Sequence, residues 1–431
     1  MKAKIIPITG ILVALLLISD SCEESVYKIF KGNAPIYMSY EELRASITTQ
    51  QNVALENPGK IYFKDNYIFI VEEQKGIHVF DNSNPSTPVK KTFVKIPGVV
   101  DISISGNILY ADSYVDLVVL DLQDINNIHE VGRVEEILRY AVPPVDNDYP
   151  MARIEEDRGV VIGWEVKQIK ERDYNHDCCY AYPVYYKDGS FLAETNASGA
   201  SGGISGNGIG AGGSMARFGI KGDALYIMSE YLVKILNISS KANPVNTGNT
   251  FYTTGDAETM FLTDKYMFIG TATGMLVFDI SVPFSPQSKS FFSHARACDP
   301  VIVDDTLAYI TLRTGTTCSG ASNMLSVINI KNIDQPKLVM TYPLTNPHGL
   351  GKDGDLLFIC DGDAGLKIFD ASDPKTITSN LIKNYPDINA FDVIPFGGLL
   401  ILIGDDGLYQ YDYSDMMNIS LISSILAQDG K

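Results

Sequence analysis

Gly274-Met-Leu-Val-Phe-Asp279 is a short apolar stretch that ends in an aspartate and runs into a polar turn. The same pattern, ending in Asp or Asn, recurs six more times along the chain. The other copies are Gly76–Asp81, Asp116–Asp121, Leu232–Asn237, Met324–Asn329, Gly365–Asp370 and Gly407–Asp412. Most copies end 40 to 50 residues apart, and the one gap of 116 residues leaves room for an insertion of roughly 75 residues.

Each copy has the same neighbours along the chain. An aromatic-rich strand such as Leu225–Ile227 lies about a dozen residues upstream, after a hairpin-type turn such as Lys221-Gly222. A further short strand precedes that turn, and a more polar strand such as His129–Val134 follows the copy. Four short antiparallel strands in about 40 residues are typical of a propeller blade. The sequence therefore predicts an all-β fold, a seven-bladed β-propeller of four-stranded antiparallel blades over residues 59–425.

The terminal Asp or Asn of each copy has a structural explanation. Its short side chain is expected to cap the backbone amides of the following turn. Seven such residues at one repeat position belong to the scaffold and are not seven active sites.

Two copies resemble a known repeat. Asp116-Leu-Val-Val-Leu-Asp121 and Gly274-Met-Leu-Val-Phe-Asp279, the latter followed by Ile280-Ser-Val-Pro283, are similar to the LVIVD repeat of bacterial propeller lipoproteins. The resemblance implies the propeller fold and a place in the bacterial cell envelope. It implies no particular activity, because that family has no common one.

The first 22 residues have the pattern of an export signal. Lys2 and Lys4 precede the apolar run Ile11–Ile18, which is shorter than the 20 or so residues of a membrane span. Ser19-Asp20-Ser21-Cys22 follows directly. The pattern predicts a signal peptide over residues 1–21 and a lipidated Cys22, which would anchor the protein to the outer membrane on its periplasmic or outer side. Ordinary cleavage that leaves a free thiol is the alternative.

The charge balance bears on possible partners. The chain has 52 acidic and 34 basic residues, a formal net charge of −18, and no basic stripe. Nucleic-acid binding is not expected, because phosphate contacts require clustered Lys and Arg. We expect no cofactor, and no metal site either, because no ligand spacing indicates one.

Two segments lie outside the repeat. Residues 22–58 form an N-terminal arm, in which Ser39-Tyr-Glu-Glu42 has a capping-box pattern that predicts a short helix to about Ile47. The insertion, residues 139–212, contains the strand-like stretch Val160–Val166. Its Gly- and Ser-rich end, residues 197–214, can bury almost nothing and is expected to be flexible. We expect the insertion to cap the top face, to which the second-to-third strand loops and the links between blades return.

The predicted ligand site lies at the mouth of the central channel. Aligned on their hairpin turns, the first strands of blades four, five and six have Glu258, Asp299 and His348 where blade two has an apolar valine. Arg296 and the top-loop residue Arg313 are close in sequence to this set. Convergent polar groups in a concave opening favour a binding site. The alternative is a wet channel mouth that needs no ligand.

Two classes of function are consistent with these residues. The first is a binding or assembly protein whose top face holds a polymer, a glycan or another envelope protein, with tyrosines of the insertion lining a groove (Tyr180, Tyr182, Tyr185 and Tyr186). The second is a hydrolase or lyase that uses the Glu258, Asp299 and His348 cluster. The chain has only five histidines, so a catalytic triad has few candidates, which favours the binding protein.

A disulfide is predicted on blade five. Cys298 begins the first strand of that blade, and Cys318 lies in its long second-to-third strand loop, so both belong to the top face. Export would supply the oxidising compartment in which the two thiols pair. The alternative is two buried thiols that do not meet.

Overall fold

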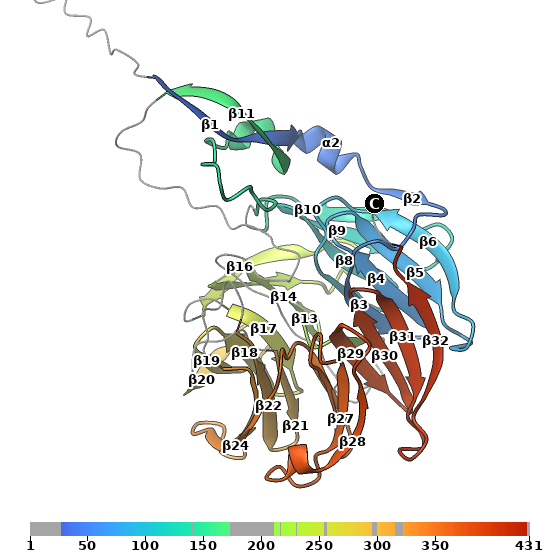
Figure 1. Cartoon of the computed structure of the whole chain (residues 1–431). Helices are drawn as coiled ribbons and strands as arrows, with labels where there is room; N and C mark the ends of the chain where they lie inside the picture. Colours follow the sequence, from blue (N-terminus) through green and yellow to red (C-terminus); the bar gives the residue numbers. More distant parts are fainter. Residues whose placement is uncertain are drawn as a thin grey trace, which may run out of the picture.

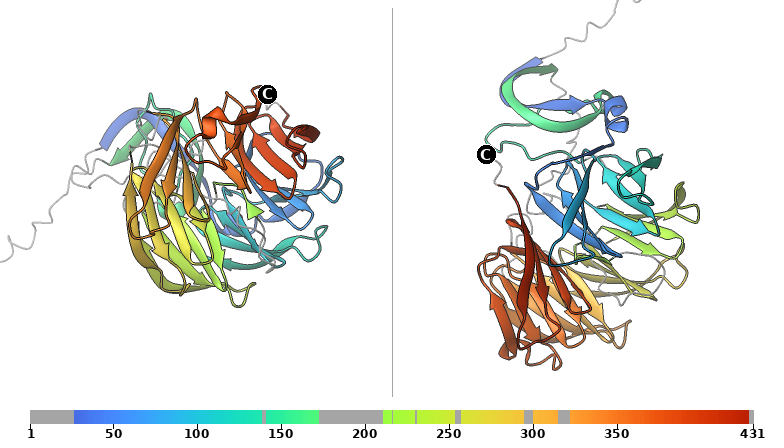
Figure 2. Two further views of the ribbon diagram at one scale, coloured as in Figure 1. Left: turned by 90° about the horizontal axis from the view of Figure 1, so that it is seen from below. Right: turned by 90° about the vertical axis from the view of Figure 1, so that its right-hand side faces the viewer.

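The computed structural model describes residues 27–138, 141–172, 211–215, 217–229, 231–253, 257–294, 300–314 and 322–428. Seven antiparallel sheets surround a central axis, six with four strands and one widened to six (Figures 1 and 2). The predicted seven-bladed β-propeller is confirmed. No helix in the described ranges has the length and apolar character needed to cross a membrane.

The blades follow one another along the chain, and in each the strand nearest the axis comes first. Blades one to three are β3 (Pro58–Lys64), β4 (Tyr67–Glu72), β5 (Gly76–Asp81), β6 (Val89–Lys95); β7 (Ile102–Ser105), β8 (Ile108–Ser113), β9 (Asp116–Asp121), β10 (His129–Val134); and β13 (Phe218–Lys221), β14 (Ala224–Ser229), β15 (Leu232–Asn237), β16 (Val245–Tyr252). Blades four and five are β17 (Ala257–Leu262), β18 (Tyr266–Thr271), β19 (Gly274–Asp279), β20 (Gln287–Ser293); and β21 (Val301–Asp304), β22 (Leu307–Leu312), β23 (Met324–Asn329), β24 (Lys337–Pro343). Blades six and seven are β25 (Leu350–Asp353), β26 (Leu356–Cys360), β27 (Leu366–Asp370), β28 (Leu381–Tyr385); and β29 (Ala390–Phe396), β30 (Leu399–Gly404), β31 (Gly407–Asp412), β32 (Ser420–Leu426).

The repeated stretch is the third strand of every blade, and its terminal residue caps the next turn as expected. In all seven blades the Asp or Asn Oδ1 accepts a hydrogen bond of 2.7–3.0 Å from the backbone amide two residues further on. The capped residues are Asp81, Asp121, Asn237, Asp279, Asn329, Asp370 and Asp412. This bond satisfies an amide that the turn would leave unpaired.

The aromatic residues of the second strands fill the spaces between blades. Tyr110, Tyr226 and Tyr309 are almost fully buried. The Tyr110 hydroxyl donates to the carbonyl of Lys241 in the next blade at 2.9 Å, and the Tyr226 hydroxyl donates to that of Pro283 at 2.7 Å. Each ring thus buries a large apolar area and keeps its hydroxyl bonded.

The N-terminal arm pairs with the insertion. β1 (Tyr27–Met38) and β11 (Val160–Arg172) form a two-stranded antiparallel ribbon that projects from the propeller (Figure 1). The sequence predicts the start of β11 but not its partner. A 3-10 turn at Glu156–Arg158 precedes β11, and another lies at Ile377–Ser379 in blade six.

A short helix attaches the ribbon to the top of blade two. α2 (Tyr40–Arg44) has the predicted capping box at Ser39 and Glu42. It ends at Arg44, before the expected Ile47, because β2 (Thr48–Gln50) pairs with β6 and needs extended backbone. Leu43 packs with Val115 of the β8–β9 loop.

The end of the insertion runs through the centre of the ring. β12 (Ala211–Gly212) pairs with the inner edge of β3 and widens blade one to six strands with β2 (Figure 2, left). The expectation that residues up to 214 bury almost nothing is wrong for this end, because Ser214 is 1% exposed. The edge of β3 supplies hydrogen-bonding groups that a glycine-rich strand can approach closely.

Candidate functional site at the channel mouth

Several predicted residues cannot be placed. Arg296, Asp299, the four insertion tyrosines, Cys22, Cys298 and Cys318 lie outside the described residues. Glu258 belongs to β17, but its side chain is likewise outside the description. The lipidation of Cys22 and the Cys298–Cys318 disulfide therefore stay predictions.

His348 and Arg313 lie close together near the top of blades five and six. The His348 amide donates to the Cys360 carbonyl at 2.7 Å, and its ring lies 5.4 Å from that of Phe391. Burial, and then the positive charge of Arg313, lowers the pKa of His348 to about 3. With this pKa the imidazole has no proton to donate near pH 7 and is only a weak base, so it does not suit the predicted acid–base role.

Four charged residues lie one position further along the first strands than the predicted Glu258, Asp299 and His348. Lys60, Asp101, Arg217 and Asp392, from blades one, two, three and seven, all lie five residues before their hairpin turns. Their charges alternate in sign around this half of the ring. We call these four residues the channel charges.

A compact ionic network joins three of the channel charges. Lys60 Nζ lies 3.3 Å from Asp101 Oδ2, and the Arg217 backbone amide donates to the same oxygen. Arg217 Nη2 donates to Asp112 Oδ2 at 3.0 Å. Burial lowers the pKa of Lys60 and raises that of Asp112, because a low-dielectric environment disfavours the charged form of each side chain. The ion pairs with Asp101 and Arg217 act in the opposite direction and favour the charged forms.

Asp392 holds the end of the insertion in place. Its Oδ1 accepts hydrogen bonds of 2.9 Å from the Ser214 amide, the Ser214 hydroxyl and the Val393 amide. The Leu350 amide donates to Ser214 Oγ at 2.8 Å, so Ser214 connects blades six and seven. Burial raises the pKa of Asp392 to about 6, and its Oδ2 is buried without a hydrogen-bond partner among the described residues.

Gly213 explains why this segment is rich in glycine. A Cβ at Gly213 would lie 1.8 Å from Asp392 Oδ2, and one at Gly349 would lie 2.2 Å from Oδ1. Only glycine lets the backbone come this close to the carboxylate. Residues 211–214 therefore lie along the inner edge of blade one and contact blades six and seven.

The LVIVD repeat family model matches residues 59–95, 98–136, 254–292 and 353–385, which fall in blades one, two, four and six. The chain is a seven-bladed β-propeller that contains LVIVD repeats. Comparison with curated protein sequences gave no match.

Solved structures resemble the LVIVD-repeat propeller in fold alone. BamB from Moraxella catarrhalis is 10% identical, with a TM-score of 0.46 over 89% of this chain and 97% of that one. Sqt1 from Saccharomyces cerevisiae is 8% identical, with a TM-score of 0.49 over 92% and 89% of the two chains. The WD40 domain of Neurospora crassa Pan2 is 8% identical, with a TM-score of 0.47 over 81% and 86%. Such distant likenesses do not indicate what this propeller binds.

The channel charges were missed by the sequence reasoning, although the signal was present. The alignment that selected Glu258, Asp299 and His348 places Lys60, Asp101, Arg217 and Asp392 together at the adjacent position. In a strand, adjacent residues face opposite sides, so a shift of one residue selects a different set of side chains.

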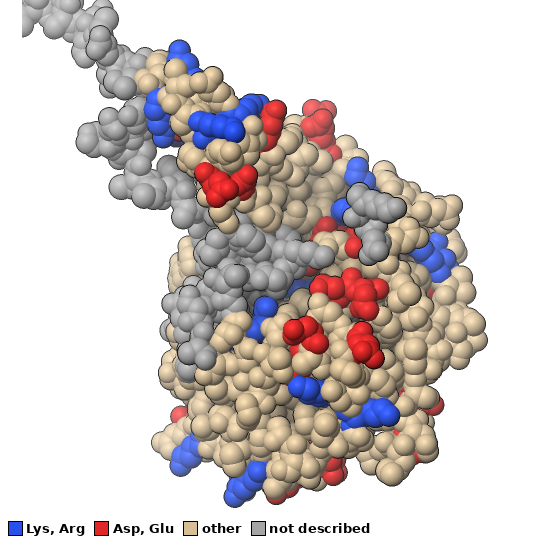
Figure 3. Space-filling view, viewed as in Figure 1, with Lys and Arg blue, Asp and Glu red and all other residues tan. Residues whose placement is uncertain are grey.

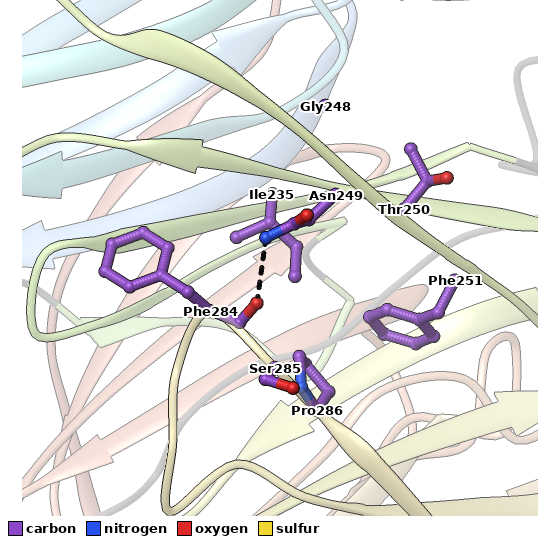
Figure 4. Close-up of a pocket in the computed structure, with 8 residues that line it drawn as sticks. All are labelled: Ile235, Gly248, Asn249, Thr250, Phe251, Phe284, Ser285 and Pro286. Carbon is purple, nitrogen blue, oxygen red and sulfur yellow. Dashed lines mark hydrogen bonds between the residues drawn. The ribbon is translucent and has the colours of Figure 1, made fainter.

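A separate hollow of about 390 Å³ lies between blades three and four of the LVIVD-repeat propeller, away from the channel mouth (Figure 4). Asn249 Nδ2 donates to the Phe284 carbonyl across it at 3.1 Å. Its lining has no charged side chain and consists of Ile235, Gly248, Asn249, Thr250, Phe251, Phe284, Ser285 and Pro286. It therefore does not contain the groups of the predicted site.

Proposed function

We infer that this protein is a lipid-anchored binding scaffold of the bacterial cell envelope, whose top face holds a polymer, a glycan or another envelope protein. The main support is that the chain exposes aromatic side chains on the top face, while residues 211–214 lie against the inner strands of blades one, six and seven. Binding to an exposed face needs no open channel.

The channel charges give little support to a catalytic role. Lys60, Asp101 and Asp392 are 8%, 1% and 1% exposed; Lys60 pairs with Asp101, and Asp392 accepts hydrogen bonds from Ser214. The channel charges therefore do not supply an accessible acid–base cluster for the hydrolase or lyase alternative.

Two exposed tyrosines on the top of blade three offer a binding surface. Tyr231 lies in the β14–β15 loop and Tyr252 ends β16. They are 46% and 71% exposed, and their rings stack with centroids 6.2 Å apart and an interplanar angle of 11°. Rigid aromatic faces of this kind give a large contact area at a low cost in conformational entropy.

Photo-crosslinking in cells tests whether the top face of blade three binds a partner. A photoreactive residue at position 252 is expected to give a crosslinked adduct. The matched control is position 417, where Met417 is 89% exposed in the β31–β32 turn on the opposite face. Protease or glycosidase sensitivity of the adduct would separate a protein partner from a glycan. Equal crosslinking at both positions, or none at 252, would contradict the proposed face.

Metabolic labelling with a fatty acid tests the anchor. Wild-type protein should incorporate the label, and the Cys22→Ala variant should not, because the acylated sulfur is absent. Equal labelling of the two proteins would refute lipidation at Cys22.

A further inference from the structure

The outer half of the β1–β11 ribbon has two chemically different faces. In antiparallel strands, directly paired residues share a face and successive pairs alternate between faces. The pairs Tyr27 with Arg172, Ile29 with Lys170, and Lys31 with Gln168 therefore share one face. We call these six residues the basic face.

The basic face differs sharply in charge from the rest of the molecule. It has three cations, Lys31, Lys170 and Arg172, and no carboxylate, in a chain whose formal net charge is −18. The acidic residue of the outer half, Glu171, pairs with Lys28 on the opposite face at 2.9 Å. Figure 3 shows several basic side chains on the ribbon.

Apolar side chains accompany these cations. Tyr27 and Ile29 are 52% and 62% exposed, and Lys170 Nζ lies 4.8 Å from the Tyr27 ring centroid. Exposed aromatic and aliphatic groups beside long basic side chains are typical of surfaces that enter the headgroup region of a membrane.

We propose that the basic face binds a surface of anionic phospholipid headgroups beside the lipid anchor. Charge complementarity identifies the occupant, because the cations match lipid phosphates and the apolar side chains match the acyl boundary. The position of the ribbon in the chain is also consistent with membrane contact. This part of the argument rests on the proposed lipidation of Cys22. Cys22 is five residues before Tyr27, so an anchored Cys22 would lie within about 18 Å of the basic face.

Vesicle sedimentation of the full chain with Cys22→Ala tests the proposal without help from an anchor. We expect binding to vesicles of mixed phosphatidylglycerol and phosphatidylcholine, at least about tenfold tighter than to phosphatidylcholine alone. Added salt should weaken the binding, because it screens exposed charges. Equal affinity for the two kinds of vesicle, or no binding to either, would overturn the proposal.

Two charge reversals locate the interaction. Lys170→Glu on the basic face should weaken binding at least about tenfold. Lys167→Glu makes the same change in net charge on the opposite face, where Lys167 Nζ lies 2.6 Å from Glu165, and should weaken it by less than about threefold. Equal losses in the two variants would show a response to net charge alone and would refute the basic face.

A third variant tests the contribution of the apolar side chains to vesicle binding. The lipidation of Cys22 can be refuted independently of this inference. Ile29→Ser should reduce the vesicle binding that remains at high salt. If the binding at high salt is the same in the variant as in the parent chain, insertion of the apolar side chains is contradicted. If wild-type protein incorporates no fatty acid but the Cys22→Ala chain binds anionic vesicles through the basic face, the anchor is refuted and this inference stands.

Discussion

Asp392 shows how one buried carboxyl both orders and destabilises the molecule. Its Oδ1 accepts three hydrogen bonds, two of them from Ser214, and so fixes the end of the insertion in the channel. Its Oδ2 is buried without a hydrogen-bond partner among the described residues, and burial raises the pKa to about 6. The ionised group is thus poorly solvated, although the nearby Lys60 partly compensates.

This pKa predicts the pH dependence of an Asp392→Asn variant. The folded protein holds the proton more tightly than the unfolded chain, whose Asp pKa is about 3.9, so the ionisation of Asp392 costs stability as pH rises from about 4 to 6. The free energy of unfolding of the variant, relative to wild type, should therefore increase by roughly 3 kcal/mol between pH 3 and pH 8. Urea unfolding at a series of pH values measures this change.

Asp412 is a control, because its ionisation is expected to change stability with pH in the opposite direction to that of Asp392. Hydrogen bonds from Ser414 lower the pKa of this exposed carboxyl, so it contributes stability above its unfolded pKa that is lost as pH falls. Asp412→Asn should therefore lose stability relative to wild type as pH rises through that range. A pH-independent difference for Asp392→Asn would show that its carboxyl titrates alike in both states.

At the scale of elements, β12 is short but lies at the centre of the ring. It adds two residues to the inner edge of β3, and Ser214 beyond it bonds to blades six and seven. Its register depends on Gly213, whose missing Cβ leaves room for the Asp392 carboxylate. A single methyl group is therefore expected to disturb the whole segment.

Gly213→Ala should destabilise the protein by roughly 1 to 3 kcal/mol, because the added Cβ would overlap a carboxylate that three hydrogen bonds hold in place. Hydrogen exchange followed by mass spectrometry should show lost protection at Gly213 and Ser214. Gly163→Ala in β11 is the matched control, since the nearest atom to its Cβ would be 3.8 Å away. Retained protection in Gly213→Ala would contradict the proposed fit.

At the scale of the whole molecule, the ring closes by packing between consecutive blades. Blade one consists of its own β3 to β6 and blade seven of its own β29 to β32, so among residues 27–428, where described, no strand from one chain end completes the blade at the other end. Ile61 and Phe63 of blade one share a buried cluster with Ile394 and Ile401 of blade seven. Within the described part of the chain, only blade one gains strands, β2 and β12.

A reciprocal amide pair joins the two end blades. Asn82 Nδ2 donates to Gln410 Oε1 at 2.7 Å, and Gln410 Nε2 donates back to Asn82 Oδ1 at 2.9 Å. Both side chains are buried. Removal of either leaves a buried amide without its partner, which costs more than the net value of the bond itself.

Gln410→Ala should therefore lower the free energy of unfolding by roughly 1 to 3 kcal/mol. The double variant with Asn82→Ala should lose less than the sum of the two single variants, because the second change removes the unpaired group. Chemical denaturation of the four proteins measures this coupling. Asn84→Ala, which removes an exposed 3.0 Å bond to Thr87, is the control and should change stability by less than about 0.5 kcal/mol. Strict additivity would contradict a joint role in ring closure.

The repeat could be predicted from the sequence because its signals are local. A third strand such as Gly274–Asp279, its hairpin neighbours and its Asp cap each depend on residues within a few positions of one another. The capping box of α2 could be predicted for the same reason.

The tertiary structure alone decided the partners that lie far apart in the chain. The pairing of β1 with β11, the position of β12 beside β3 and the contact of Ser214 with Asp392 join residues more than a hundred positions apart. Such contacts leave no periodic signal, because they depend on where the closed ring brings its inner edges. The same reason explains why the sequence did not indicate the channel charges. A strand alignment identifies equivalent positions, but only the three-dimensional ring shows which side chains meet.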